Sequence, residues 1–119
     1  MDMQVKGLVW LGLRTSKFEE TVKFFTEIMN LSIGKEVNGF ALLRLPNGDK
    51  VEVFGPQDED HRFFTSPVVG FLVDDIRQAR AEMEAAGVEF IGPIHTSEHD
   101  SWSHFRGPEG NISELTSRT

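Results

Sequence analysis

The sequence has no cysteine, and its 12 lysine and arginine residues are outnumbered by 19 aspartate and glutamate residues, for a net charge of −7. The absence of thiols excludes a disulfide framework and a thiolate zinc site, and it fits a reducing compartment. A negative net charge disfavours binding to nucleic acid or to an anionic membrane. The first 13 residues lack a basic leader and a small-residue cleavage site. We therefore expect a cytoplasmic protein whose partner is a small molecule or another protein.

One nine-residue pattern is present twice. Residues 44–52 and 106–114 both read R-x-P-x-G-x-x-x-E, and the two copies are 62 positions apart. Proline and glycine at fixed places mark a tight turn between two extended runs. Each copy therefore predicts a β-hairpin whose return strand carries a glutamate, Glu52 or Glu114, at the same height. The chain is interpreted as a duplicated module.

The first module is predicted to cover about residues 5–55. A β-rich run at residues 5–13 precedes a helix that begins at about Lys17, where Ser16 and Glu19 have the spacing of a capping box. Asn30 is predicted to end this helix. Its apolar stripe consists of Phe18, Val22, Phe25 and Met29, and strands follow at about residues 32–37, 40–45 and 50–54.

The second module, about residues 67–117, follows a polar stretch at 56–66 that is predicted to be a solvated linker. Asp75 opens its helix and Gly87 ends it. The helix stripe is Ile76, Ala79, Met83 and Ala86, and the strands lie at about residues 68–73, 88–91, 101–106 and 111–116. We therefore predict an α+β fold for residues 1–119, one domain of two tandem βαβββ modules that form a cleft lined by sheet faces.

Alternation along the strands separates the residues that face the helices from those on the open side. Leu11, Leu13, Val51 and Val53 are predicted to face the first helix. The open side then receives Trp10, Arg14, Phe40, Glu52 and Phe54 in the first module and Trp102, His104, Arg106 and Glu114 in the second. Glycine in a strand leaves room for a close approach, so Gly12 and Gly70 are interpreted as widening the cleft.

Three segments give the chain a family resemblance. They are the helix FEETVKFF at 18–25 that leads to Met29-Asn30-Leu31, the run VGFLVDDI at 69–76, and the closing FRGPEGNISEL at 105–115, which is close to F-x-D-P-D-G-N-x-x-E-L and departs from it at Gly107. With them the chain resembles the vicinal oxygen chelate superfamily, which includes glyoxalase I, the bleomycin- and fosfomycin-resistance proteins and extradiol dioxygenases. The resemblance implies the glyoxalase/bleomycin-resistance-like fold and a homodimer.

The resemblance also identifies four positions that hold a metal ion in metal-dependent members. In this chain they are Trp10, Glu52, Val68 and Glu114. Transition metals favour sets of three or four ligands that include imidazole, and only the two glutamates can bind a cation. We expect no metal cofactor, and the alternative is a divalent ion such as Mg²⁺ held weakly by Glu52 and Glu114.

The first functional hypothesis is metal-independent binding of a small, partly aromatic or cationic molecule in the cleft between the modules. Aromatic side chains would hold its body, and charged or polar ones would bind its edges. The aromatic set is Trp10, Phe40 and Trp102, and the polar set is Arg14, Glu52, His104 and Glu114.

The alternative is a lyase or isomerase of the glyoxalase type that acts on a carbonyl compound. Glu114 would be the base, and His104 or Arg14 would stabilise the developing negative charge, with or without a weakly bound divalent metal. A third hypothesis is an interaction module that acts through its dimer.

Structural interpretations of the same residues stay open. Each glutamate could pair with Arg14, Lys50 or His104, Trp10 could fill the space of a lost metal, and His104 could be a hydrogen-bonded strand residue. His95 and His99 fall in a stretch predicted to be a flap over the cleft.

Overall fold

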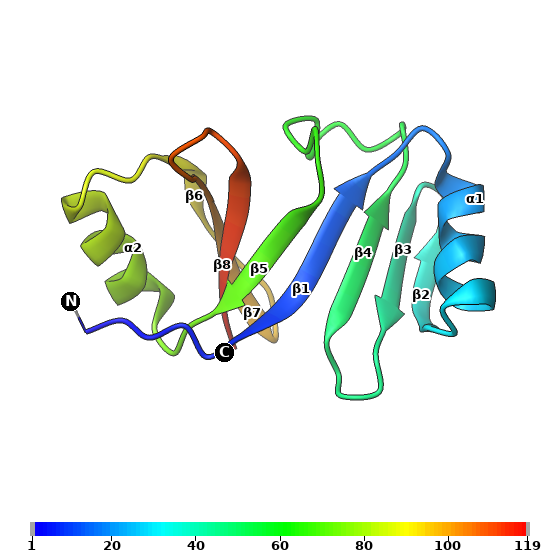
Figure 1. Cartoon of the computed structure of the whole chain (residues 1–119), viewed down its shortest axis with the longest axis horizontal. Coiled ribbons are helices and arrows are strands. Elements are labelled where there is room, and N and C mark those ends of the chain that lie inside the picture. Colours follow the sequence, from blue (N-terminus) through cyan, green and yellow to red (C-terminus); the bar gives the residue numbers. More distant parts are fainter. Residues whose placement is uncertain (1, 119) are drawn as a thin grey trace. The chain divides into compact units, whose positions relative to one another are not determined.

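The computed structural model describes residues 2–118. These residues form two compact units, which are described one at a time: residues 10–68, and residues 69–118 together with 2–9. We call them the 10–68 unit and the 69–118 unit. Figure 1 labels their helices and strands along the chain.

The 10–68 unit contains four strands in the order β2-β3-β4-β1. Strand β1 runs parallel to β4, whereas β3 is antiparallel to both of its neighbours. This is the predicted βαβββ order. The elements are β1 (Gly7–Arg14), α1 (Phe18–Lys23), the π-helical turn η1 (Phe24–Ile28), β2 (Ser32–Val37), β3 (Phe40–Arg44) and β4 (Lys50–Phe54).

Helix α1 lies on one face of these strands. The core between them contains Val22, Ala41, Leu43, Val51 and Val53, with Leu11, Leu13, Phe18 and Phe25 packed against it. The alternation predicted for β1 and β4 is confirmed on this face. Burial of such branched side chains supplies most of the stability of a short helix on a sheet.

Two details at the ends of α1 differ from the sequence prediction. The N-cap residue is Lys17, and no side chain caps the helix. Ser16 therefore lies one residue before the N-cap, and Glu19 lies one residue before the position that a capping box requires. At the other end, Met29 N–H donates to the carbonyl of Phe24, five residues back, so the π turn rotates Met29 away from the core and leaves 51% of it exposed.

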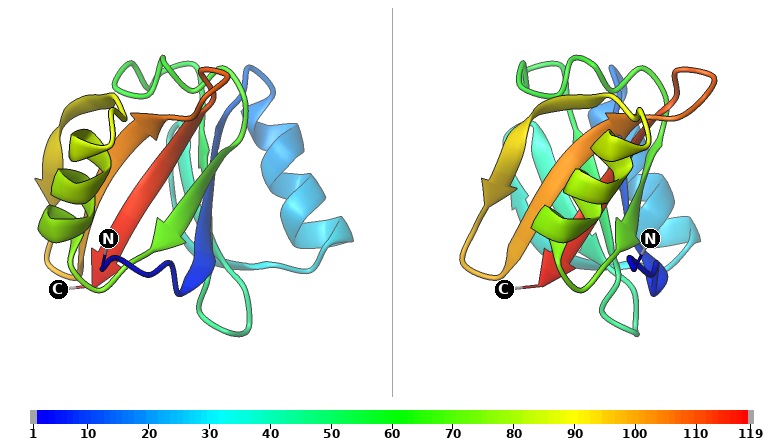
Figure 2. Two further views of the ribbon diagram at one scale, coloured as in Figure 1. Left: turned by 60° about the vertical axis from the view of Figure 1, so that its left-hand side comes forward. Right: turned by 90° about the vertical axis from the view of Figure 1, so that its left-hand side faces the viewer.

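The 69–118 unit repeats the arrangement, with strand order β5-β8-β7-β6. Strand β5 is parallel to β8, and β7 is antiparallel to β8 and β6. Figure 2 shows helix α2 in yellow-green beside the strands of this unit. The elements are β5 (Val68–Leu72), α2 (Ile76–Ala85), β6 (Phe90–Thr96), β7 (Asp100–Arg106) and β8 (Ile112–Arg118).

The signals predicted for α2 are confirmed at both of its ends. The Asp75 side chain accepts a hydrogen bond from Gln78 N–H at 3.1 Å, and Gly87 adopts φ +94° after the last turn. Ala86 lies beyond the helix and is exposed, so only the first part of the predicted stripe is buried. The core of the unit is Val73, Ile76, Ala79 and Leu115, with Met3, Phe71, Met83, Phe90, Ile94 and Phe105 packed against it.

The two hairpins have matching registers, which confirms the duplication. Glu52 on β4 lies opposite Leu42 on β3, and Glu114 on β8 lies opposite His104 on β7. The parallel neighbours match as well, because Gly12 on β1 aligns with Glu52 and Gly70 on β5 aligns with Glu114. An offset of 62 positions therefore relates Leu42 to His104 and Glu52 to Glu114.

Strand β6 extends further than the sequence suggested. A register shift between Ile91 and His95, with Gly92 at φ +73°, lets the strand continue past Pro93 to Thr96. His95 therefore lies in a strand, and its predicted place in a flap is wrong.

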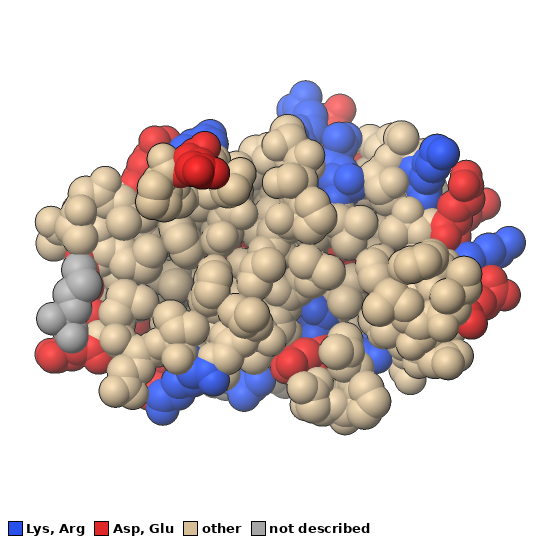
Figure 3. Space-filling model, in the orientation of Figure 1, with Lys and Arg blue, Asp and Glu red and all other residues tan. Residues whose placement is uncertain are grey.

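None of the helices in residues 2–118 has the length and apolar character needed to cross a bilayer. On the face shown in Figure 3, acidic and basic side chains occur next to one another in several places.

Candidate functional site

Trp10 and Glu52 form the central polar contact of the 10–68 unit. The indole Nε1–H of Trp10 donates a hydrogen bond of 2.9 Å to Glu52 Oε1, and both side chains are partly buried. The contact forms because β1 and β4 are parallel neighbours and Glu52 aligns with Gly12, two residues after Trp10. The indole therefore extends along its own strand to reach the carboxylate.

Gly12 provides the space that the indole needs. A Cβ placed on Gly12 would lie 2.0 Å from Cη2 of Trp10 and 2.5 Å from its Cζ2. No side chain other than hydrogen fits there while the ring keeps this position. The prediction that Gly12 widens a cleft is wrong, because Trp10 fills the space that the glycine leaves.

Trp10 belongs to a series of aromatic contacts within the unit. Trp10 meets Phe64 edge to face at 6.1 Å between centroids, and Phe40 lies 5.4 Å from Phe54. Phe54 is 6% exposed and Phe64 is 4% exposed. Phe64 comes from residues 56–66, which the sequence predicts to be a solvated linker. Its burial shows that this part of the segment is packed and not solvated.

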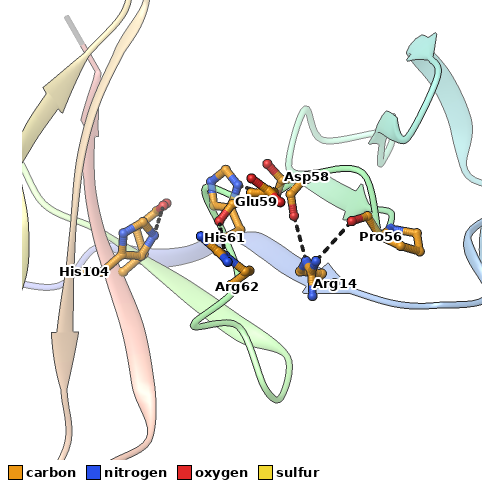
Figure 4. Close-up of polar contacts among 8 residues, drawn as sticks. Arg14, Pro56, Asp58, Glu59, His61, Arg62 and His104 are labelled. Carbon is orange, nitrogen blue, oxygen red and sulfur yellow. Dashed lines mark hydrogen bonds and ion pairs between the residues drawn. The ribbon is translucent and has the colours of Figure 1, made fainter.

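Arg14 holds the backbone of that stretch. Its Nε donates to the Asp58 carbonyl at 2.9 Å and its Nη2 donates to the Pro56 carbonyl at 3.2 Å, as Figure 4 shows. A guanidinium has five N–H donors, so these bonds fix Arg14 without using all of them. The described partners of Arg14 are therefore backbone carbonyls of one loop, and its predicted contact with a ligand stays a prediction.

Sequence reasoning missed His61 in the same stretch. Its ring stacks on Phe54 with 4.0 Å between centroids, and its Nδ1 lies 2.8 Å from Asp58 Oδ2. The signal in the sequence is an aspartate three residues before a histidine, followed by Phe63-Phe64 in an otherwise polar run. Two adjacent phenylalanines are unusual in a solvated linker.

In the 69–118 unit, His104 and Glu114 are directly opposite each other on β7 and β8. His104 Nε2 lies 3.1 Å from Glu114 Oε1, and the two side chains are 5% and 6% exposed. Burial lowers the pKa of His104 from 6.5 to about 4, because an imidazolium loses hydration there. An ionised carboxylate at this distance would favour the imidazolium, but burial is the larger effect. His104 is therefore neutral at pH 7.

Trp102 lies on β7, two residues before His104. The ring of His95, its partner on β6, stacks against it at 5.7 Å between centroids with an interplanar angle of 23°. The structure thus gives Trp102 a neighbour within its own unit. Its predicted contact with a ligand stays a prediction, as does that of Phe40.

The residues at the four metal positions do not fit a transition-metal site. The indole N–H of Trp10 is a donor without a lone pair for a metal, and it already binds Glu52. Val68 is apolar and 1% exposed. Among residues 2–118, no three histidine, aspartate or glutamate side chains are grouped as metal ligands. In each unit the carboxylate instead meets a ring nitrogen of that unit.

The modules obtain that ring nitrogen from different strands. In the 10–68 unit it comes from Trp10 on β1, whereas in the 69–118 unit it comes from His104 on β7. The equivalent positions are occupied by Leu42 and Val68, which have no polar group. The duplication therefore preserves the carboxylate and changes its partner.

Comparisons with known proteins agree with this architecture. A family model described as Glyoxalase/Bleomycin resistance protein/Dioxygenase superfamily matches residues 7–115. No curated protein matches the chain.

Several solved structures are similar to the chain. Methylmalonyl-CoA epimerase from Mycobacterium tuberculosis has a TM-score of 0.73 at 17% identity, with 97% of this chain and 89% of that chain covered. A hypothetical protein from Bacillus halodurans C-125 has a TM-score of 0.74 at 14% identity, with 100% and 96% covered. A superfamily member from Vibrio splendidus 12B01 has a TM-score of 0.66 at 16% identity, with 97% and 98% covered. At these identities the structural matches establish the fold.

Proposed function

The chain belongs to the Glyoxalase/Bleomycin resistance protein/Dioxygenase superfamily, and we propose that it binds a small molecule with an aromatic body and a cationic group, independently of a metal ion. The observation that supports the proposal most is the 2.9 Å bond from the Trp10 indole to Glu52. It puts an N–H donor where metal-dependent members would have a ligand. The carboxylate is thereby oriented by the protein itself.

Glu52 and its surroundings suit an ammonium group. A carboxylate can accept several hydrogen bonds at once, so the bond from Trp10 is compatible with a further one from an amine. A charge-assisted bond of this kind is stronger than one between neutral groups. Trp10 and Phe40 are partly exposed aromatic rings of the same unit, and such rings attract both planar groups and cations.

A binding experiment with two probes tests the proposal. Trp102→Phe leaves Trp10 as the sole tryptophan, so its fluorescence reports binding of phenethylamine or of the neutral analogue 2-phenylethanol. Glu52→Gln is expected to weaken phenethylamine binding about tenfold, because it removes a charge-assisted hydrogen bond, and to leave 2-phenylethanol binding unchanged.

Glu36→Gln is the matched control, because it removes the same charge from an exposed position on β2 of the same unit. It should change neither affinity. An equal loss in Glu36→Gln and Glu52→Gln would show that only net charge matters, and it would refute a specific site at Glu52.

A second candidate function is proton transfer next to a carbonyl group. It is supported by the buried pair of Glu114 and neutral His104, whose Oε1 and Nε2 atoms lie 3.1 Å apart, because a buried carboxylate beside an imidazole can act as a general base. Several similar structures are methylmalonyl-CoA epimerases. Solvent deuterium exchange into methylmalonyl-CoA should be lost in Glu114→Gln and retained in Glu52→Gln. Exchange that persists in Glu114→Gln would exclude Glu114 as the base.

A further inference from the structure

Asp58 and His61 form a polar pair outside the predicted site residues. His61 Nδ1 lies 2.8 Å from Asp58 Oδ2, and the side chains are 26% and 18% exposed. One face of the imidazole lies on Phe54, and its ring also meets Phe64 at 5.0 Å between centroids. The histidine is thus held by stacking and by a carboxylate while part of it stays accessible.

The loop backbone supports this orientation. Asp58 N–H donates to the Gly55 carbonyl at 3.1 Å, and Phe64 N–H donates to the His61 carbonyl at 2.9 Å. Arg14 on β1 binds the Asp58 carbonyl at 2.9 Å. Asp58 is therefore fixed to the sheet on one side and to the imidazole on the other. Figure 4 shows this connection from Arg14 through Asp58 to His61.

The carboxylate determines which ring nitrogen carries hydrogen. An ionised Asp58 can only accept, so the neutral imidazole places its hydrogen on Nδ1 and a lone pair on Nε2. Nε2 points away from Asp58 along the other edge of the ring. This is the arrangement in which a carboxylate prepares a histidine to accept a hydrogen bond from another molecule.

His61 stacks on Phe54, which lies on the same strand as Glu52. Phe54, which carries the stacked imidazole, follows Glu52 by two residues on the same face of the strand, a separation of roughly 7 Å. Phe64 contacts both His61 and Trp10, so one aromatic cluster joins the two polar groups. A ligand that contacts both groups needs polar substituents at two ends of its body.

We propose that His61 Nε2 accepts a hydrogen bond from a hydroxyl group at the end of the ligand opposite to its ammonium group, and that Asp58 is the positioning residue. This inference rests on the proposed function and specifies its ligand class as hydroxylated aromatic amines. The ammonium group binds Glu52, the ring lies against the partly exposed ring of Trp10, and the hydroxyl reaches His61.

Tyramine and phenethylamine test the inference because they differ only by the phenolic hydroxyl. Isothermal titration of the unmodified protein should give about threefold to tenfold tighter binding of tyramine, the range of one neutral hydrogen bond. His61→Phe keeps a ring to stack on Phe54 but removes both nitrogens. It should abolish the preference for tyramine and leave the affinity for phenethylamine unchanged.

Asp58→Asn distinguishes a role of Asp58 in orienting His61 from a role in folding. With the carboxylate gone, the ¹⁵N chemical shifts of the His61 side chain should show a changed tautomer balance, and the preference for tyramine should decrease while phenethylamine binding persists. His99→Asn, at an exposed histidine of the 69–118 unit, is the control and should change neither.

The outcomes are distinct for the two proposals. An unchanged preference for tyramine in His61→Phe refutes the role of His61 and leaves the binding of amines at Glu52 intact. Binding of neither probe to the unmodified protein refutes both proposals. A preference for tyramine that is lost in His61→Phe and reduced in Asp58→Asn, with phenethylamine binding retained in both variants, supports both proposals.

Discussion

Replacing Gly12 by alanine tests the packing that holds Trp10 against Glu52. The added Cβ would lie 2.0 Å from Cη2 of Trp10, far inside van der Waals contact, and the nearest atoms belong to a rigid ring. The indole must therefore leave its place. Its hydrogen bond to Glu52 and its edge contact with Phe64 are lost together.

The size of the effect follows from these contacts. A hydrogen bond to a charged group contributes about 1.5–3 kcal/mol, and an aromatic pair adds about 0.5–1.5 kcal/mol. Alanine recovers about 0.5–1 kcal/mol, because glycine loses more backbone freedom on folding. The free energy of unfolding of Gly12→Ala should therefore decrease by about 1–4 kcal/mol.

Urea unfolding and the fluorescence of Trp10 in a Trp102→Phe background measure stability and the position of the indole. Gly7→Ala is the matched control on the same strand, because its Cβ would have only an ordinary contact of 3.7 Å with Val9. In a Trp10→Leu background, Gly12→Ala should cost nothing. An equally large loss of stability in the Trp10→Leu background, or unchanged Trp10 fluorescence in Gly12→Ala, would show that the indole does not occupy the space at Gly12.

Two further predictions concern the 69–118 unit and the helix starts. Because burial lowers the pKa of His104 from 6.5 to about 4, the unfolded chain binds more protons than the folded one between these pH values. The free energy of unfolding should decrease by up to about 3 kcal/mol as the pH falls through this window, and His104→Gln, followed by urea unfolding at several pH values, should reduce that slope. Asp75→Ala should lower stability by about 1 kcal/mol, because it removes the cap of α2, whereas Ser16→Ala should have little effect, because no side chain caps α1. Equal losses in Asp75→Ala and Ser16→Ala would contradict the assignment of the two caps.

The duplicated architecture could be predicted because its signals are local. The R-x-P-x-G-x-x-x-E pattern places a turn and a return strand, and alternation separates Val51 and Val53 from Glu52. Asp75 and Gly87 mark the ends of α2 by capping chemistry that acts within a few residues. These features need no knowledge of the rest of the chain.

Features that depend on contacts between distant segments could not be predicted in the same way. Met29 fits a regular helix, but the π turn before it shifts its direction. Gly12 indicated a nearby group without identifying Trp10, its neighbour on the same strand. The polar residues around His61 predicted a solvated segment. The burial of Phe64 could not be predicted from them, because it depends on packing against Trp10 and Phe54.

The partners of the two glutamates illustrate the same limit of local reasoning. Alternation along the strands predicted that Trp10 and Glu52 share the open side of the first module, and that His104 and Glu114 share the open side of the second. It did not determine which side chain would meet each carboxylate, since Arg14 satisfied the same rule. The register between strands brings Trp10 to Glu52 and His104 to Glu114. Arg14 instead binds carbonyl groups of the loop that follows β4.

Binding of phenethylamine to protein that has been dialysed against a chelator shows whether Trp10, and not a metal ion, is the group that orients Glu52. We predict the same affinity by isothermal titration before and after chelation, and no gain when Zn²⁺, Ni²⁺ or Mg²⁺ is added. Binding that disappears on chelation and returns with one of these ions would show that a metal ion orients Glu52.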